Sequence, residues 1–86
     1  MKEILPYIIT RLKKAKVKYE VHWFDSGATM IDIWVNNYFY VIQLDDDEIG
    51  LSLVTEKTLL FDNKPDSVFK DQETFKIELE KIPQLD

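Results

Sequence analysis

The side chains best suited to catalysis in this chain are one histidine and a nearby aspartate. His22 is the single histidine, and Asp32 follows it along the chain. The strand pairing expected below places His22 directly opposite Asp32, where a cross-strand hydrogen bond forms readily. A histidine oriented by an aspartate is one part of a catalytic triad. An enzyme centred on these two residues is therefore one hypothesis.

The triad hypothesis requires a nucleophile close to the histidine. Ser52 falls in the same row of the expected sheet, but about 14 Å from His22 at a strand spacing of about 4.8 Å. Direct proton transfer requires hydrogen-bond distance. Ser26 and Thr29 lie nearer in the chain, but no nucleophile-elbow sequence surrounds them. We therefore interpret His22 and Asp32 as a structural pair and do not expect an enzyme.

The segment "LDDDEIG", residues 44–50, concentrates four carboxylates, the ligand type that Ca²⁺ and Mg²⁺ prefer. Consecutive residues of a tight loop point in different directions, and the spacing of a calcium-binding loop is absent from the segment. We expect a solvated turn whose charge discourages association at the sheet edge. The sequence also lacks a phosphate loop, a dinucleotide fingerprint and zinc-site spacing, so we expect neither a metal nor a cofactor.

The charge of the chain is unevenly distributed around a net value of −5. Residues 1–18 carry six basic side chains and one acidic one, whereas residues 19–86 carry five basic and fifteen acidic. Lysines near the end of a helix complement its dipole, and the acidic remainder would repel a duplex, so we expect no nucleic-acid partner. The absence of cysteine and of a long apolar stretch predicts a cytoplasmic protein with no membrane segment.

An N-terminal helix and four strands are expected to position these side chains. Ile4, Ile8 and Leu12 follow helical spacing, which predicts an amphipathic helix over residues 2–16. The apolar period then changes to two, which is typical of strands. The four expected strands cover residues 19–24, 30–35, 38–44 and 49–54. The turn residues between them are "DSGAT", Asn36-Asn37 and "DDDE".

The alternation of apolar residues also predicts how the strands pair, since a one-residue slip would turn the apolar side chains to the wrong face. The second hairpin should pair Val35 with Tyr38, Ile33 with Tyr40 and Ile31 with Ile42. The third should pair Leu44 with Ile49 and Ile42 with Leu51. For the first hairpin we expect a five-residue loop, with Trp23 opposite Ile31 and Val21 opposite Ile33. One face of the sheet is then apolar: Tyr19, Val21, Trp23, Ile31, Ile33, Val35, Tyr38, Tyr40, Ile42, Leu44, Ile49, Leu51 and Leu53.

The C-terminal part is expected to cover the sheet with a second helix. Phe75, Leu79 and Ile82 follow helical spacing, and Asp66 or Asp71 would cap the helix. The alternation of residues 75–79 also allows a strand. Residues 59–61 are apolar enough to form a short added strand or to pack along the sheet edge. The predicted fold is one α+β domain over residues 1–86: an N-terminal helix, a four-stranded antiparallel meander and a C-terminal helix, in two layers.

The second face of the expected sheet carries an apolar patch rimmed by acids, which is typical of an interface unless the C-terminal segment covers it. We expect a small acidic protein-binding module, such as an inhibitor or immunity-type protein for a basic partner. The expected partner-binding residues are Trp34, Phe39, Asp45, Asp46, Asp47 and Glu48. The alternative is a homodimer that buries Trp34 and Phe39 against a second copy. No motif in the sequence identifies the partner.

Overall fold

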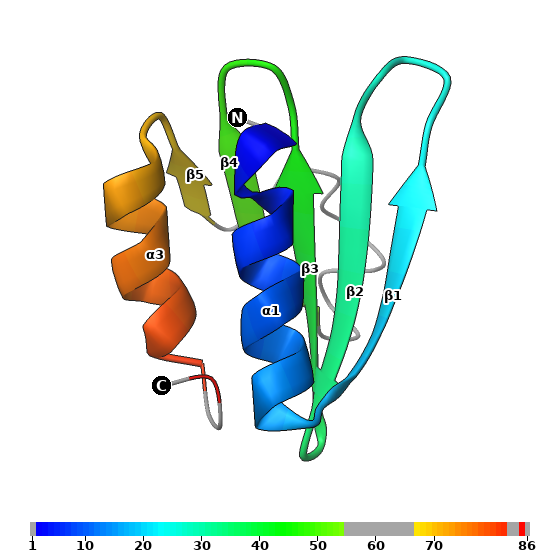
Figure 1. Cartoon of the computed structure of the whole chain (residues 1–86), viewed down its shortest axis with the longest axis vertical. Coiled ribbons are helices and arrows are strands. Elements are labelled where there is room, and N and C mark those ends of the chain that lie inside the picture. Colours follow the sequence, from blue (N-terminus) through cyan, green and yellow to red (C-terminus); the bar gives the residue numbers. More distant parts are fainter. Residues whose placement is uncertain (1, 55–66, 83–84, 86) are drawn as a thin grey trace.

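The computed structural model describes residues 2–54, 67–82 and 85 (Figure 1). A short 3₁₀ turn, Lys2–Ile4, leads into helix α1, Leu5–Ala15. The strands are β1 (Lys18–Trp23), β2 (Thr29–Val35), β3 (Tyr38–Leu44), β4 (Ile49–Val54) and β5 (Ser67–Phe69), and helix α3 covers Gln72–Glu80. The five strands form one antiparallel sheet in the order of the chain. The α+β fold with a helix at each end is confirmed, and β5 is an addition. The strand considered near residues 59–61 lies outside the described residues.

Helix α1 forms because its apolar residues share one face. Ile8 and Leu12 are fully buried, and Pro6 lies in the first turn, where its missing N–H is tolerated. The helix ends at Lys16, which adopts the left-handed conformation with φ of 59°. The Lys16 N–H donates to the carbonyls of Leu12 and Lys13, which satisfies the end of the helix. This is a position that glycine usually occupies.

The second and third hairpins have the predicted register. Asn36 takes a positive φ of 55° in the turn that pairs Val35 with Tyr38. Residues 45–48 connect β3 to β4 and pair Leu44 with Ile49. Both turns are short, so the length of each loop and the alternation of the strands allow one register only.

The predicted register of the first hairpin is wrong by two residues on β1. Trp23 lies opposite Thr29, and Val21 lies opposite Ile31. The turn is tighter than expected, since the Phe24 N–H donates to the Ala28 carbonyl at 3.1 Å. The Gly27 N–H donates to the Phe24 carbonyl at 2.9 Å, and Gly27 has φ of 94°, as in a three-residue turn with a glycine bulge. A slip of two residues keeps every side chain on its predicted face.

Helix α3 confirms the helical interpretation of the C-terminal segment. Asp71 is the cap: its Oδ1 accepts from the Thr74 N–H at 2.8 Å, and its Oδ2 accepts from the Thr74 hydroxyl at 2.9 Å. Phe75 and Leu79 point into the core, and the Phe75 ring packs edge-on against Phe69 of β5 with centroids 5.6 Å apart. The strand in this part of the chain is β5, Ser67–Phe69, which Lys70 separates from the Asp71 cap.

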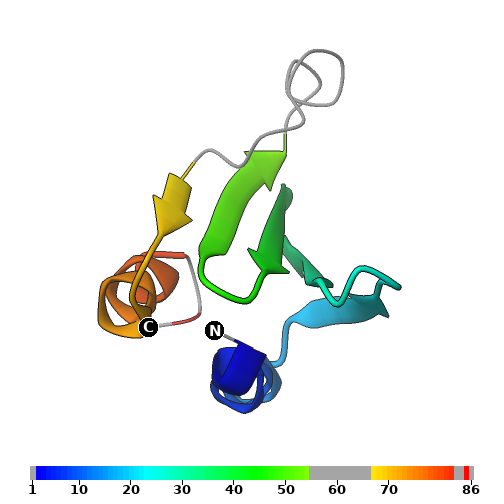
Figure 2. The same cartoon turned by 90° about the horizontal axis from the view of Figure 1, so that it is seen from above.

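Both helices lie on the same side of the sheet (Figure 2), against the predicted apolar face. Two predicted core-face residues stay exposed: Trp23, on the edge strand, and Tyr38, the first residue of β3. Among the described residues, no helix is long and apolar enough to cross a membrane. In the part of the chain that the structure describes, the buried apolar residues are Ile4, Ile8, Leu12, Ile31, Ile33, Val35, Ile42, Leu44, Ile49, Phe69, Phe75, Leu79, Ile82 and Leu85.

Candidate functional site

The face of the sheet opposite the helices carries the candidate site, on strands β1 to β3. Its side chains form three rows across the strands, because alternate residues share a face. The pairings of β2 with β3 and of β3 with β4 in these rows are confirmed, whereas the members from β1 differ from the predicted register by two positions. The rows are Lys18–Trp34–Phe39–Val54, Glu20–Asp32–Val41–Ser52 and His22–Met30–Gln43–Gly50.

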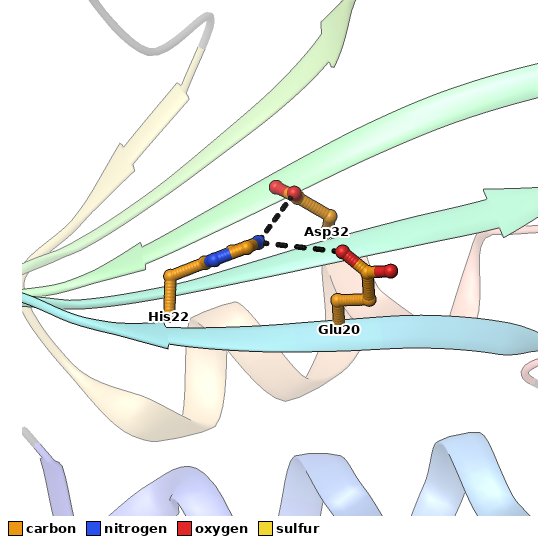
Figure 3. A network of polar contacts seen from close by, with 3 residues as sticks. All are labelled: Glu20, His22 and Asp32. Carbon is orange, nitrogen blue, oxygen red and sulfur yellow. Dashed lines mark hydrogen bonds and ion pairs between the residues drawn. The ribbon is translucent and has the colours of Figure 1, made fainter.

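His22 does bond to Asp32, but along a diagonal of the sheet (Figure 3). The His22 Nε2–H donates to Asp32 Oδ2 at 2.9 Å, although the direct partner of His22 is Met30. A diagonal neighbour lies within reach of a long side chain such as imidazole. Glu20 lies opposite Asp32, and its Oε2 is 3.7 Å from the same His22 nitrogen. The three residues form a polar cluster with His22 between two carboxylates.

The polar cluster of Glu20, His22 and Asp32 has the donor set of a divalent-cation ligand group. One ligand atom from each residue lies within 4.8 Å of the other two. Imidazole and carboxylate together suit zinc and related metals. The side chains of Glu20 and His22 are exposed, at 56% and 45%, so water competes with any ion there. The triad hypothesis needed Ser52 as a nucleophile near this cluster. Ser52 lies two strands from Asp32, at about 10 Å, which is too far for direct proton transfer.

The neighbouring row holds an ordered aromatic pair. The rings of Trp34 and Phe39 stack with centroids 5.0 Å apart and an angle of 18° between planes. Lys18 Nζ lies 5.0 Å from the centre of the Trp34 ring, which is cation–π distance. The predicted pairing of Val21 with Ile33 would place Glu20 opposite Trp34, whereas the observed register places Lys18 there. The rim of the aromatic pair is therefore basic at the start of β1.

In the acidic loop between β3 and β4, Glu48 bonds to another segment of the chain, whereas Asp46 and Asp47 are exposed. The Asp45 N–H donates to the Glu48 carbonyl at 3.0 Å and closes the loop. Lys70 Nζ donates to Glu48 Oε2 at 2.7 Å, and this bond and the charge of Glu48 raise the pKa of Lys70. Glu48 thus connects the loop to the segment before α3. Asp46 and Asp47 remain exposed at the tip.

The six predicted partner-binding residues occupy two separate places. Trp34 and Phe39 flank the β2–β3 turn, whereas residues 45–48 follow the far end of β3 (Figure 1). Phe39 and Leu44 are five residue steps apart along an extended strand, which corresponds to about 17 Å. The acidic loop and the aromatic pair therefore lie at opposite ends of the same strand.

Sequence reasoning missed Glu20 as a member of the polar cluster and Trp23 as an exposed residue. Glu20 and His22 are two apart on one strand and so share a face, which was a usable signal. Trp23 is exposed on an edge strand, and its exposure depends on tertiary packing, which no local pattern indicates. Comparisons of the chain with protein-family models, with curated proteins and with solved structures found no match.

Proposed function

We propose that the chain is a small acidic protein-binding module for a basic partner, in the manner of an inhibitor or immunity-type protein. The observation that supports this most is the stacked pair of Trp34 and Phe39 on the sheet face opposite the helices. Aromatic residues dominate the energetics of protein interfaces. Because the two rings already hold each other in place, binding would cost little side-chain entropy.

The acidic loop supplies the long-range attraction in this proposal. Asp46 and Asp47 are exposed, and the chain carries a net charge of −5. The Debye length is about 8 Å at physiological ionic strength, shorter than the distance of about 17 Å between Phe39 and Leu44, the residue before the loop. The loop would therefore act on the approach of a basic partner and change the association rate more than the contact itself.

The aromatic part of the proposal is tested by affinity capture from the source cell. Phe39→Ala removes half of the stacked pair, and Tyr38→Ala is the matched control, because Tyr38 is the exposed neighbour on the other face. Phe39→Ala should lose the captured partner, and Tyr38→Ala should keep it. Thermal melting must show that both variants fold. Identical partners for wild type and folded Phe39→Ala would refute the proposal.

The acidic part is tested with variants that remove two charges. The pair Asp46→Asn and Asp47→Asn leaves in place Asp45, which accepts a hydrogen bond from Gln43 Nε2 at 3.3 Å. The control, Asp25→Asn with Glu73→Gln, removes two exposed charges elsewhere. Only the loop variant should slow association, and the effect should shrink in high salt. Equal association rates for both double variants would exclude a steering role for the loop.

A further inference from the structure

Among the described strands, β1 is one of the two edges of the sheet, and we propose that two copies of this chain pair there through antiparallel β1 strands. The sheet order begins with β1, which has β2 as its neighbour and lies at the margin of the molecule in Figure 1. The edge also exposes large aromatic residues, since Trp23 is 70% and Phe24 49% accessible. This surface differs from the aromatic pair of the proposed function, so each proposal can fail without the other.

The register of β1 with β2 determines which backbone groups face outward. The Phe24 N–H bonds to Ala28, which continues the β1–β2 pairing and makes Phe24 a hydrogen-bonded position toward β2. Hydrogen-bonded positions alternate along an antiparallel pair. Lys18, Glu20 and His22 therefore bond inward. The remaining three residues, Tyr19, Val21 and Trp23, direct their N–H and C=O groups away from the sheet.

A two-fold axis at Val21 uses all three outward residues at once. Val21 then pairs with the partner's Val21, and Tyr19 pairs with the partner's Trp23 on each side of the axis. These pairs make up to six backbone hydrogen bonds, whereas a shift of two residues in either direction leaves at most four. A shift of one residue is excluded, because opposite residues of an antiparallel pair must point to the same face. Two β1 edges therefore form the most hydrogen bonds in one register, with the two-fold axis at Val21.

The polar side chains favour the same register. With the axis at Val21, Glu20 lies opposite the partner's His22, and the symmetry repeats this pair. An axis at Glu20 would place two carboxylates opposite each other, and an axis at His22 would place two imidazoles opposite each other. Like charges directly opposite destabilise a strand pair, which counts against the axis at Glu20, and the axis at His22 leaves each imidazole without a carboxylate directly opposite. At the margins, the axis at Val21 places Lys18 opposite the partner's Phe24, next to the partner's Asp25.

The dimer also covers the exposed aromatic surface at the edge. Trp23 lies on the helix side of β1, opposite Thr29 of β2, with no aromatic neighbour across that pair. In the proposed dimer it gains the partner's Tyr19 as a cross-strand neighbour, a favourable kind of pair. Unprotected edges with apolar residues are the usual places for pairing between chains. A second copy is the occupant that satisfies both the backbone and the charges.

The first experiment is light scattering over a range of concentrations, with EDTA present so that metal bridging between polar clusters does not contribute. Wild type should reach twice the chain mass of 10.2 kDa. Glu20→Lys places a cation opposite the partner's His22, and His22→Glu places a carboxylate opposite the partner's Glu20. Each should weaken the dimer about tenfold or more. The double variant places opposite charges across the strand pair and should recover the dimer. A wild type that stays monomeric, or a double variant no better than the singles, would overturn the proposal.

The second experiment determines the register through single cysteines in a chain that has none. Hydrogen-bonded partners have Cα atoms about 5.5 Å apart, which a disulfide can span. Val21→Cys should therefore form a covalent dimer under mild oxidation, and Glu20→Cys and His22→Cys should not. Cross-linking at position 20 or 22 would overturn the register. A dimer that cross-links at none of the three would exclude the edge and point to the Trp34 face.

Discussion

His22 bonds to Asp32 at 2.9 Å although neither is the other's direct cross-strand partner. The pair is diagonal because β1 is displaced by two residues from the predicted register, which had placed His22 directly opposite Asp32. The same displacement places Glu20 opposite Asp32 and so completes the polar cluster. A single turn, closed by Phe24 and Ala28, therefore determines which charged groups meet on this face.

The interaction between His22 and Asp32 should contribute little to stability. The His22 side chain is 45% exposed, and exposed pairs are screened by water and salt. A double-mutant cycle with His22→Gln and Asp32→Asn should give a coupling energy below about 1 kcal/mol in urea unfolding. A coupling of several kcal/mol would contradict this account and would indicate that the polar cluster is buried in solution.

The left-handed end of α1 offers a stabilising substitution. A non-glycine residue in this conformation costs about 1–2 kcal/mol, which exceeds the entropy that glycine adds to the unfolded chain. Lys16→Gly should therefore raise the free energy of unfolding by about 0.5–1 kcal/mol. Lys14→Gly is the control: it lies inside the helix and should lower the free energy by about 1 kcal/mol. Equal effects of the two substitutions would contradict the assigned helix end.

The cap of α3 predicts a pH dependence of stability. Hydrogen bonds from the Thr74 N–H and hydroxyl lower the pKa of Asp71 below its ordinary value of 3.8. A carboxyl group with a lower pKa in the folded state stabilises the fold above its unfolded-state pKa, and this is lost as the pH falls through the folded-state value.

Asp71→Asn can still cap the helix but does not titrate. The difference in melting temperature between wild type and Asp71→Asn should therefore change between about pH 5 and pH 2. The melting temperature of wild type should fall more than that of the variant over this range. If the melting temperatures of the two proteins fell equally with pH, the carboxylate would not be the cap.

The buried face of β2 should be sensitive to the loss of one methyl group. Ile33 is fully buried, and Ile33→Val should lower the free energy of unfolding by about 0.5–1.5 kcal/mol. Ile77 is 59% exposed on α3, and Ile77→Val makes the same chemical change with little effect. Chemical denaturation of both variants measures the difference. Equal losses would contradict the position of the core.

The parts of the fold that the sequence predicted are those that depend on local signals. Asn36-Asn37 and the four-residue acidic loop define their hairpins, because each loop allows one register that keeps the apolar face together. "DSGAT" was less decisive, since Gly27 allows a bulged turn and shifts β1 by two residues without changing any face. Strand β5 was not predicted, because three residues become a strand only through pairing with β4.

The parts of the candidate site that depend on local turns were also predictable from the sequence. The row of Trp34 and Phe39 came from the second hairpin and is confirmed, whereas the neighbours from β1 required the correct first turn. The role of Glu48 in binding Lys70 depends on a contact between distant parts of the chain, which no local pattern indicates.

The central claim is that the sheet face bearing Trp34 and Phe39 contacts a protein partner. The most direct measurement is photo-cross-linking in the source cell with p-benzoylphenylalanine in place of Phe39, or in place of Ile77 on the exposed side of α3. The account predicts a specific cross-linked protein from position 39 and none from position 77. Cross-links from position 77 alone, or from neither position, would contradict it.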